Sequence, residues 1–203
     1  ENHIVIVPGA NGEMDRAYIE RNIDTIADAD YILFQLEIPL ETIQHTLSLL
    51  KGRRGKTVLD PAPAPEEPLP KELLANVDFI TPNESEAESL TGVAVKDEES
   101  ARKAAAELMR QGASTVIIKA GSAGAYVLED ERIRKVPGFS VEVADTTAAG
   151  DAFNAGLAYA LGEGSSVEEA VRYGNAVGAM SCTGFGAQSA MPRLEEVEKL
   201  LAR

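Results

Sequence analysis

Short apolar runs alternate with amphipathic stretches along most of the chain. The apolar runs are rich in β-branched residues and predict strands at His3–Val7, Tyr31–Leu36, Thr57–Asp60, Phe79–Thr81, Thr115–Lys119 and Ala125–Leu128. Between them, apolar positions recur every three or four residues, which predicts helices at Asp15–Ala27, Pro39–Lys51, Glu84–Leu90 and Glu98–Gln111. From Ala148 onward the pattern is almost wholly helical and ends in a helix at Leu194–Ala202.

This alternation predicts an α/β fold, with a mostly parallel, doubly wound sheet flanked by helices, because parallel strands are joined by helical crossovers. Val136–Val143 breaks the pattern, and we expect it to add an antiparallel strand at an edge. The Pro-rich stretch Pro61–Pro70 directly follows a strand and is typical of a loop, not of an interdomain linker. We therefore predict one domain over residues 1–203.

Charge narrows the range of partners. The chain carries 33 Asp and Glu against 19 Lys and Arg, for a formal net charge of -14. Nucleic acids and anionic membranes are bound by clustered cations, and the one basic run, Lys51–Lys56, is short. No apolar run approaches the roughly 18 residues of a membrane helix. We predict neither nucleic acid nor a membrane as a partner.

Cys182 is the single cysteine, which excludes a disulfide framework or a cysteine-rich zinc site within this chain and favours a reducing, cytoplasmic compartment. The chain opens at Glu1 without a methionine and enters an apolar run almost at once. We expect it to be a segment of a longer protein.

Polar and glycine-rich residues follow the predicted strands. In an open α/β sheet, ligands bind outside the carboxyl ends of the strands, so these residues are the first candidates for a site. They are Glu37, the segment Asp60-Pro61-Ala62, the segment Pro82 to Glu86, and Gly121-Ser122-Ala123-Gly124. Their convergence on one edge predicts a site for a charged ligand.

The most informative segment runs from Asp145 to Gly156. Ala148, Ala149 and Gly150 are small and open directly into a helix, whose first N–H groups have no internal partners and carry the positive end of the dipole. They predict an anion site. Asp151 follows in the first turn, where a carboxylate could take a proton from a hydroxyl while a developing phosphoryl charge is held beside it.

Each of these features also has a structural interpretation. Asp151 could simply stabilise the helix dipole, and Asn83 with Glu86 has the spacing of a capping box. Glu37 could be solvated, and Gly121–Gly124 could be an ordinary hairpin turn. Cys182 could pack as a small apolar residue.

Two phosphate-binding motifs are rejected. Gly55-Lys56-Thr57 ends like a P-loop, but Leu50 stands at the first glycine position and the segment precedes a strand. No G-x-G-x-x-G follows a strand, so a dinucleotide site is not supported.

Taken together, the motifs resemble a known family. The run Asp145-Thr146-Thr147-Ala148-Ala149-Gly150-Asp151, followed by Phe153-Asn154, closely resembles the C-terminal signature of the ribokinase-like (PfkB) sugar kinases. Four further motifs occur in the family's order: Pro8-Gly9-Ala10-Asn11, Asp60-Pro61-Ala62-Pro63-Ala64, Thr81 to Glu88, and Gly186-Ala187-Gln188. Such joint occurrence favours function over the separate structural interpretations.

The resemblance implies an ATP-dependent kinase that phosphorylates a sugar, with D-ribose and its 5-hydroxyl expected, and with Mg²⁺ and K⁺ as cofactors. Asp151 would be the catalytic base, and the backbone of Ala148, Ala149 and Gly150 the anion hole. Glu37 would contact the sugar. The roles implied toward the nucleotide fall on Asn83, Glu86 (which would also hold Mg²⁺ through water), Lys119, Gly121, Gly124 and Asn175. Those implied toward a monovalent cation fall on Asp145, Thr147, Ser181, Gly184 and Gly186.

The chain departs from the family in two ways. Lys119 stands where many relatives have a threonine. The family's N-terminal third, with its β-sheet lid and most of the sugar clamp, has no counterpart here. Two alternatives therefore stay open: a nucleotide-binding segment that does not turn over, and a kinase of another sugar or a nucleoside. Any homo-oligomer would have to form without the lid that carries the family's dimer contact.

Overall fold

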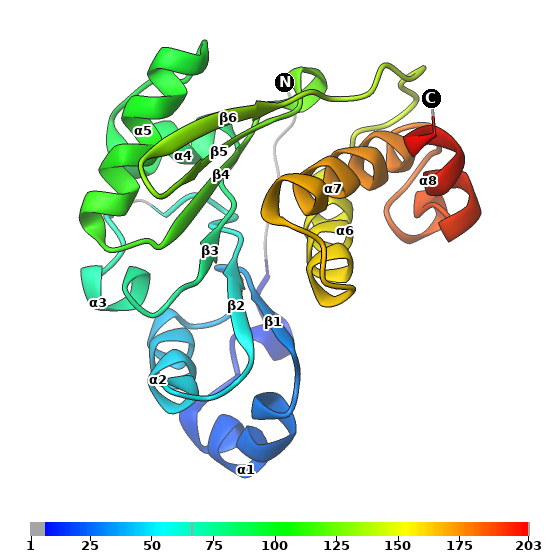
Figure 1. Ribbon diagram of the computed structural model, residues 1–203. Coiled ribbons are helices and arrows are strands. Elements are labelled where there is room, and N and C mark those ends of the chain that lie inside the picture. The colour runs from blue at the N-terminus through cyan, green and yellow to red at the C-terminus, as the bar shows by residue number, and fades with distance from the viewer. Residues whose placement is uncertain (1–6, 66, 203) are drawn as a thin grey trace.

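The computed structural model describes residues 7–65 and 67–202. Within these residues, six strands form one sheet in the order of the chain (Figure 1). They are β1 (Tyr31–Phe34), β2 (Lys56–Leu59), β3 (Phe79–Ile80), β4 (Thr115–Lys119), β5 (Ala125–Glu129) and β6 (Arg132–Val136). Strands β1 to β4 are parallel, and β5 and β6 are added antiparallel beyond β4.

The helices connect the parallel strands or follow the sheet. They are α1 (Arg16–Ala27), α2 (Leu40–Leu50), α3 (Lys71–Leu74), α4 (Glu84–Thr91), α5 (Glu98–Gln111), α6 (Ala149–Gly162), α7 (Val167–Ser181) and α8 (Leu194–Leu201). Short 3₁₀ turns lie at Gly9–Asn11, Gly121–Ala123 and Gln188–Ala190. The predicted fold class is confirmed, and the predicted strand β4 and helix α5 match the structure at both ends.

Alternate strand positions bury against two separate layers of helices. On one face, Leu59, Ile80 and Ile118 pack with residues of α2 to α5. On the other, Val58 and Ile117 pack with residues of α6 and α7, among others. Figure 1 shows α4 and α5 on one side of the sheet and α6 and α7 on the other. This two-sided burial is why these strands are apolar at successive positions instead of alternating.

The edge strand differs from the prediction. The edge strand is β6, which pairs antiparallel with β5, and residues 137–143 carry no strand. Because β6 is rich in charged residues, its sequence is typical of a solvated loop and did not predict a strand. Asp130 and Glu131, both with positive φ, make the tight turn that leads from β5 into β6. Pro137 then ends the ladder because it has no N–H to donate.

Other differences are local. Helix α3 was not predicted and follows directly from the Pro-rich loop. The predicted strand His3–Val7 lies outside the described residues except for Val7, which is exposed and in no strand. The helical prediction after Ala148 holds for α6, α7 and α8 but not for the intervening loop at residues 182–187.

Candidate active site

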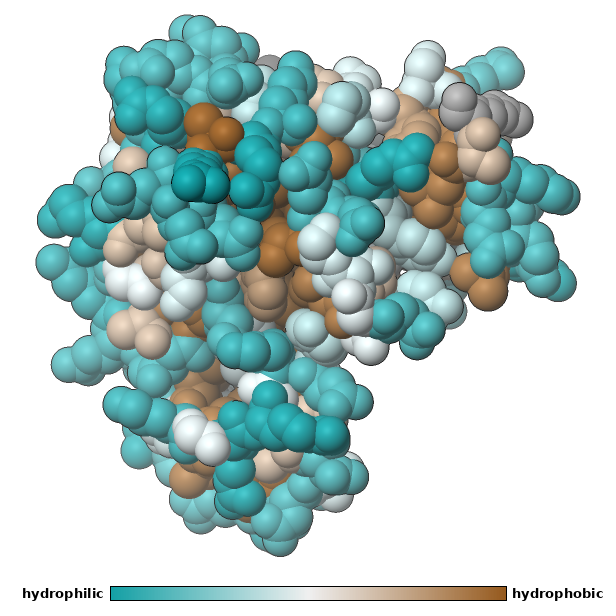
Figure 2. All heavy atoms as spheres, in the orientation of Figure 1, coloured by the Kyte–Doolittle hydropathy of each residue, from teal (hydrophilic) through white to brown (hydrophobic). Residues whose placement is uncertain are grey.

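A cavity of about 800 Å³ opens at the carboxyl ends of β2 and β4, between the first turns of α4 and α6. Figure 2 shows hydrophobic atoms in the hollow between the α4–α5 side and the α6–α7 side of the molecule. The polar lining comes from several chain segments: Asp60, Asn83, Glu84, Ser85, Glu86, Lys119, Ser122, Ser140, Thr146, Asp151 and Asn175. The strand-end segments singled out in the sequence, Glu37 excepted, therefore meet at one cavity.

The start of α6 forms one wall of this cavity. Ala148 is the N-cap of the helix and has a φ of +60°, in the left-handed region that residues other than glycine seldom adopt. The N–H of Ala149 donates to the carbonyl of Thr146, and the first intrahelical bond runs from Ala152 N–H to the Ala148 carbonyl. The N–H groups of Gly150 and Asp151 therefore precede the helical ladder, at the positive end of the dipole. Of the three predicted anion-hole residues, Ala149 has its N–H already engaged.

Asp151 is exposed in the first turn of α6. Gln35, just past the end of β1, donates its side-chain N–H to Asp151 Oδ1 at 2.6 Å. Asp151 lines both the main cavity and a smaller one of about 200 Å³, whose other lining includes Leu33 and Asn154. Asp151 thus lies between two hollows, with a hydrogen-bond donor that orients it.

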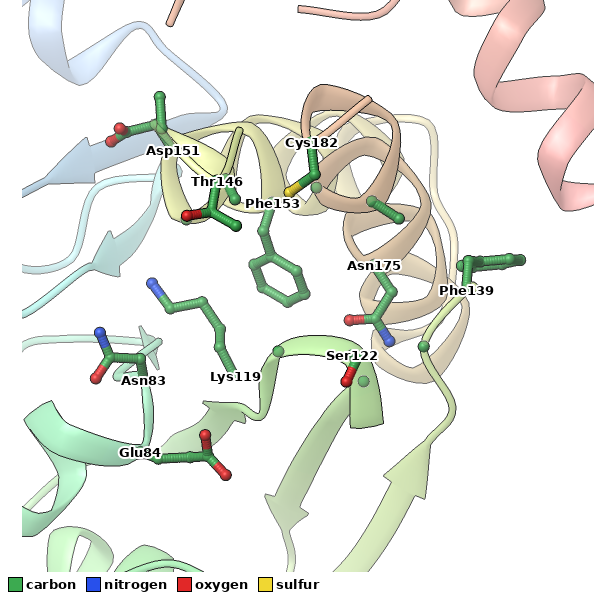
Figure 3. A pocket seen from close by; sticks show the side chains of 18 of the residues that line it. Asn83, Glu84, Lys119, Ser122, Phe139, Thr146, Asp151, Phe153, Asn175 and Cys182 are labelled. Carbon is green, nitrogen blue, oxygen red and sulfur yellow. The ribbon is translucent and has the colours of Figure 1, made fainter. Parts of the chain in front are cut away.

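A buried ion pair lies beside the α6 N-terminus. The Lys119 ammonium donates to both carboxylate oxygens of Asp60, at 2.9 and 2.8 Å, and the side chains are 13% and 6% exposed. The Asn154 amide N–H also donates to Asp60, at 2.5 Å, while the Asn154 Oδ1 has no partner within the described residues. A Cβ added to Gly150 would lie 3.3 Å from the Lys119 Nζ. Figure 3 shows the Lys119 side chain running toward this helix end between Asn83 and Phe153.

Asn83 and Glu86 form a capping box at the start of α4, as one interpretation of their spacing predicted. The Asn83 side chain accepts from Glu86 N–H, and the Glu86 carboxylate accepts from Asn83 N–H at 2.7 Å. Both residues also line the cavity. Burial raises the pKa of the Glu86 carboxyl, although the hydrogen bond from Asn83 and the charge of Lys119 oppose this rise. Structural and ligand-binding roles are therefore compatible at these two positions.

The turn from β4 to β5 and one residue of α7 complete the predicted nucleotide residues. Gly121 and Gly124 line the cavity within the connection between β4 and β5, so the interpretation of this segment as a hairpin turn is confirmed. Gly124 has a φ of +99°, and a Cβ there would collide with the Val136 carbonyl. Asn175 is buried at the cavity wall and donates to the carbonyls of Val136 and Pro137.

Three of the five residues predicted to bind a monovalent cation are joined by hydrogen bonds. One oxygen of Asp145 accepts from the N–H and hydroxyl of Thr147, and the other accepts from Gly186 N–H at 2.9 Å. These hydrogen bonds lower the pKa of the Asp145 carboxyl, and the bond from Gly186 N–H has the largest effect. Ser181 is buried and donates to the Gly178 carbonyl, and Gly184 lies in the loop after α7. None of the five lines the cavity.

Glu37 is exposed in the turn after β1 and is not among the cavity-lining residues. Sequence reasoning missed Gln35, and it assigned no specific role to Asp60 or Asn154, although both lie in the motifs quoted for the family. Asp60 had two sequence signals, its place directly after a strand and its position at the start of the motif Asp60-Pro61-Ala62-Pro63-Ala64. Cys182 lines the cavity and is partly buried.

Comparison with known proteins identifies the family. The model of the pfkB family carbohydrate kinases matches residues 1–194, so the chain belongs to this family. The chain is 44% identical over 201 residues to a ribokinase of Haemophilus influenzae, a match that covers 99% of the chain and 65% of that relative. The chain therefore spans less than two thirds of the length of this relative.

Solved ribokinase structures have the same fold. The ribokinase of Thermotoga maritima is 40% identical, with a TM-score of 0.86. The ribokinase of Arabidopsis thaliana, complexed with ribose and ATP, is 32% identical, with a TM-score of 0.93. Each match covers 100% of this chain and 66% of the other.

The side chains available as metal ligands limit which metal ions this chain could bind. No group of three or more His, Cys, Asp or Glu side chains within the described residues is arranged to hold a metal ion. Mg²⁺, however, is commonly held by one or two carboxylates together with waters and substrate phosphates, and the buried Glu86 carboxylate at the cavity fits such a site. The pKa of the Asp145 carboxyl is lowered, so this group stays ionised at lower pH than usual, and its negative charge fits a monovalent cation. In the part of the chain that is described, no helix has the length and apolarity needed to cross a membrane.

Proposed function

We propose that this chain carries the nucleotide site and the general base of an ATP-dependent sugar kinase. D-Ribose is the proposed substrate, phosphorylated at its 5-hydroxyl. The observation that carries the proposal is the α6 N-terminus, where N–H groups with no acceptor within the described residues and an acidic side chain adjoin one large cavity. Membership of the pfkB family and the likeness to ribokinases support the same substrate class.

In this mechanism the Asp151 carboxylate accepts the proton of the sugar hydroxyl as its oxygen bonds to the γ-phosphorus of ATP. The bond from that phosphorus to the β–γ bridging oxygen breaks, and ADP leaves. The N–H groups of Gly150 and Asp151 bind the phosphoryl oxygens, and Gln35 orients the carboxylate before the reaction. Mg²⁺, when bound, would neutralise phosphate charge, and Glu86 with Asn83 would hold it through water.

The Asp145 carboxylate and the loop that it binds would hold K⁺ next to the α6 N-terminus. Asp145 lies three residues before Ala148, and its bond to Gly186 N–H ties the two segments together. A cation there adds positive charge near the anion site. Asp145→Asn should therefore abolish any preference for K⁺ over Na⁺, while the fold is retained.

The direct test is ribose-dependent release of ADP by the 203-residue chain, with Mg²⁺ and ATP, in K⁺ and then in Na⁺. We expect turnover that requires ribose and is faster in K⁺, and ³¹P NMR should identify ribose 5-phosphate. Turnover with other sugars or nucleosides but not with ribose would contradict the substrate assignment.

Two observations favour a second function. The chain spans 65% of the Haemophilus influenzae relative, and Glu37, the one residue with an implied role that is confined to the sugar, does not line the cavity. A nucleotide-binding segment without turnover would bind ATP in calorimetry yet release no ADP with any sugar. The same preparation therefore distinguishes the two functions.

A further inference from the structure

The charges that line the cavity are unbalanced. Within the described part of the chain, four carboxylates contribute to the lining, from Asp60, Glu84, Glu86 and Asp151. Lys119 is the single cationic side chain among these lining residues. A nucleoside triphosphate carries several negative charges, and like charges repel strongly where water is scarce. The position of this one ammonium group therefore has a large influence on whether the cavity accepts a polyphosphate.

One of the three Lys119 N–H donors has no acceptor within the part of the chain that the structure describes. An ammonium group carries three N–H bonds, and two are directed to the two oxygens of Asp60. The same carboxylate accepts from Asn154, so Asp60 is itself held in place. The lysine is fixed at its far end, yet it remains part of the cavity wall.

The ammonium also lies against the helix end that would bind phosphate. The absence of a side chain at Gly150 leaves room for it, because a Cβ there would be 3.3 Å from the Lys119 Nζ. An anion bound to the N–H groups of Gly150 and Asp151 would be a neighbour of the ammonium.

We propose that Lys119 is a catalytic residue that donates a hydrogen bond to the phosphoryl group transferred from ATP, with Asp60 and Asn154 as the positioning residues that hold its ammonium at the α6 N-terminus. This inference rests on the proposed function. Lys119 keeps its proton throughout, and its charge offsets the charge on the phosphoryl oxygens as the bond to ADP breaks.

The alternative is that the ion pair only ties the ends of β2 and β4 together. Replacing Lys119 alone cannot separate the two roles, because it would leave Asp60 buried without its cation and could unfold the chain. The double variant Asp60→Asn/Lys119→Met removes both charges and keeps an acceptor for Asn154. Because the pair is net neutral, its removal does not change the net charge of the cavity. A loss of affinity then reports the contact with the ammonium itself.

The chain offers a matched control on the same strand. Lys56, at the start of β2, pairs with Asp78 at 2.7 Å, and neither residue lines any of the cavities described above. The control Asp78→Asn/Lys56→Met makes the same chemical change away from the site. Thermal unfolding of both double variants would confirm that each is folded.

Calorimetry with ATP, ADP and adenosine, each in the presence of Mg²⁺, tests the proposal. In the Asp60/Lys119 variant we expect ATP to bind about 10- to 100-fold more weakly, the range for a lost hydrogen bond to a charged group. ADP should lose less, and adenosine should bind as before. The control variant should bind all three like the unaltered chain.

Two results would overturn the inference alone: unchanged ATP affinity in the Asp60/Lys119 variant, or equal losses for ATP and adenosine. The second would mean that the pair only shapes the cavity. An unaltered chain that binds none of the three compounds would overturn the proposed function, and this inference with it.

Discussion

Strand β2 has an Asp–Lys ion pair at each end, and the two pairs have different surroundings. At the amino end, Lys56 and Asp78 are 56% and 32% exposed, and the second Asp78 oxygen accepts from the N–H and hydroxyl of Thr57. At the carboxyl end, Lys119 and Asp60 are 13% and 6% exposed and lie at the wall of the large cavity. The first pair is open to water, and its Asp78 carboxylate also accepts two hydrogen bonds from Thr57. The second pair is buried at the cavity wall, and one of the three Lys119 N–H groups has no acceptor within the described residues. Identical residue types thus serve anchoring at one end of the sheet and, on our proposal, chemistry at the other.

The largest effect expected at the carboxyl end is on turnover. Asp151→Asn should lower ribose-dependent ADP release about 10²- to 10⁴-fold, the usual contribution of a general base. Gln35 can still bond to the new side chain, and Asp151 is exposed, so nucleotide affinity and stability should change little. An equal loss of turnover and of ATP affinity would contradict the assignment of Asp151 as the base.

The next effect is on stability at the same end. Lys119→Met should lower the free energy of unfolding by about 3–5 kcal/mol, because it leaves the Asp60 carboxylate buried without a cation. Adding Asp60→Asn should recover most of this loss, and urea unfolding measures both. If the double variant were as unstable as the single one, burial of the Asp60 charge would not be the cause.

Glu86 predicts a smaller, pH-dependent effect. Burial raises the pKa of Glu86 above its ordinary 4.5, so the folded chain binds this proton more readily than the unfolded chain does. The ionised carboxyl therefore lowers stability at pH 7, and this penalty disappears as the pH falls below the ordinary pKa. Glu86→Gln retains the capping box and should be slightly more stable than the unaltered chain at pH 7, with the difference fading in acid. Urea unfolding from pH 4 to pH 8 checks this, and a constant difference would contradict it.

The smallest effect belongs to the amino end. Lys56→Met should cost about 1 kcal/mol or less, because its pair is well exposed to water. Asp78 would still accept from Thr57. Nucleotide affinity should stay the same. A loss as large as that of Lys119→Met would erase the distinction between the two ends of β2.

Much of the fold was predictable because the buried face of a strand or helix appears in the sequence as a local pattern of apolar residues. Strand β4 is buried on both faces and reads as an apolar run, and α5 has an apolar stripe between a capping Asp97 and Gly112. Strand β6 was missed because its side chains are mostly charged and it pairs on one side only. The turn at Asp130 and Glu131 directs this segment back along β5, but the turn contains no glycine or asparagine, the residues from which such a turn is usually predicted.

The site was predictable where the topology brings strand ends together. Asn83 was found in this way, Asp151 from the small residues that precede its helix, and Lys119 only from the resemblance to the family; all three line the cavity. The side-chain partners were not predicted, because they join distant positions: Asp60 and Lys119 are 59 residues apart, and Gln35 and Asp151 are 116 apart. No local pattern encodes such pairs.

On the proposed function, the carboxyl end of the sheet binds nucleotide phosphates at the start of α6. NMR spectra of the backbone amides and the lysine ammonium groups of the 21.6 kDa chain, recorded as Mg²⁺ and a non-hydrolysable ATP analogue are added, are the decisive measurement. Our account predicts that the amide signals of Gly150 and Asp151 and the ammonium signal of Lys119 shift, whereas those of Thr57 and Asp78 at the other end of the sheet stay in place. Saturation with nucleotide while Gly150 and Asp151 remain unperturbed would contradict the account.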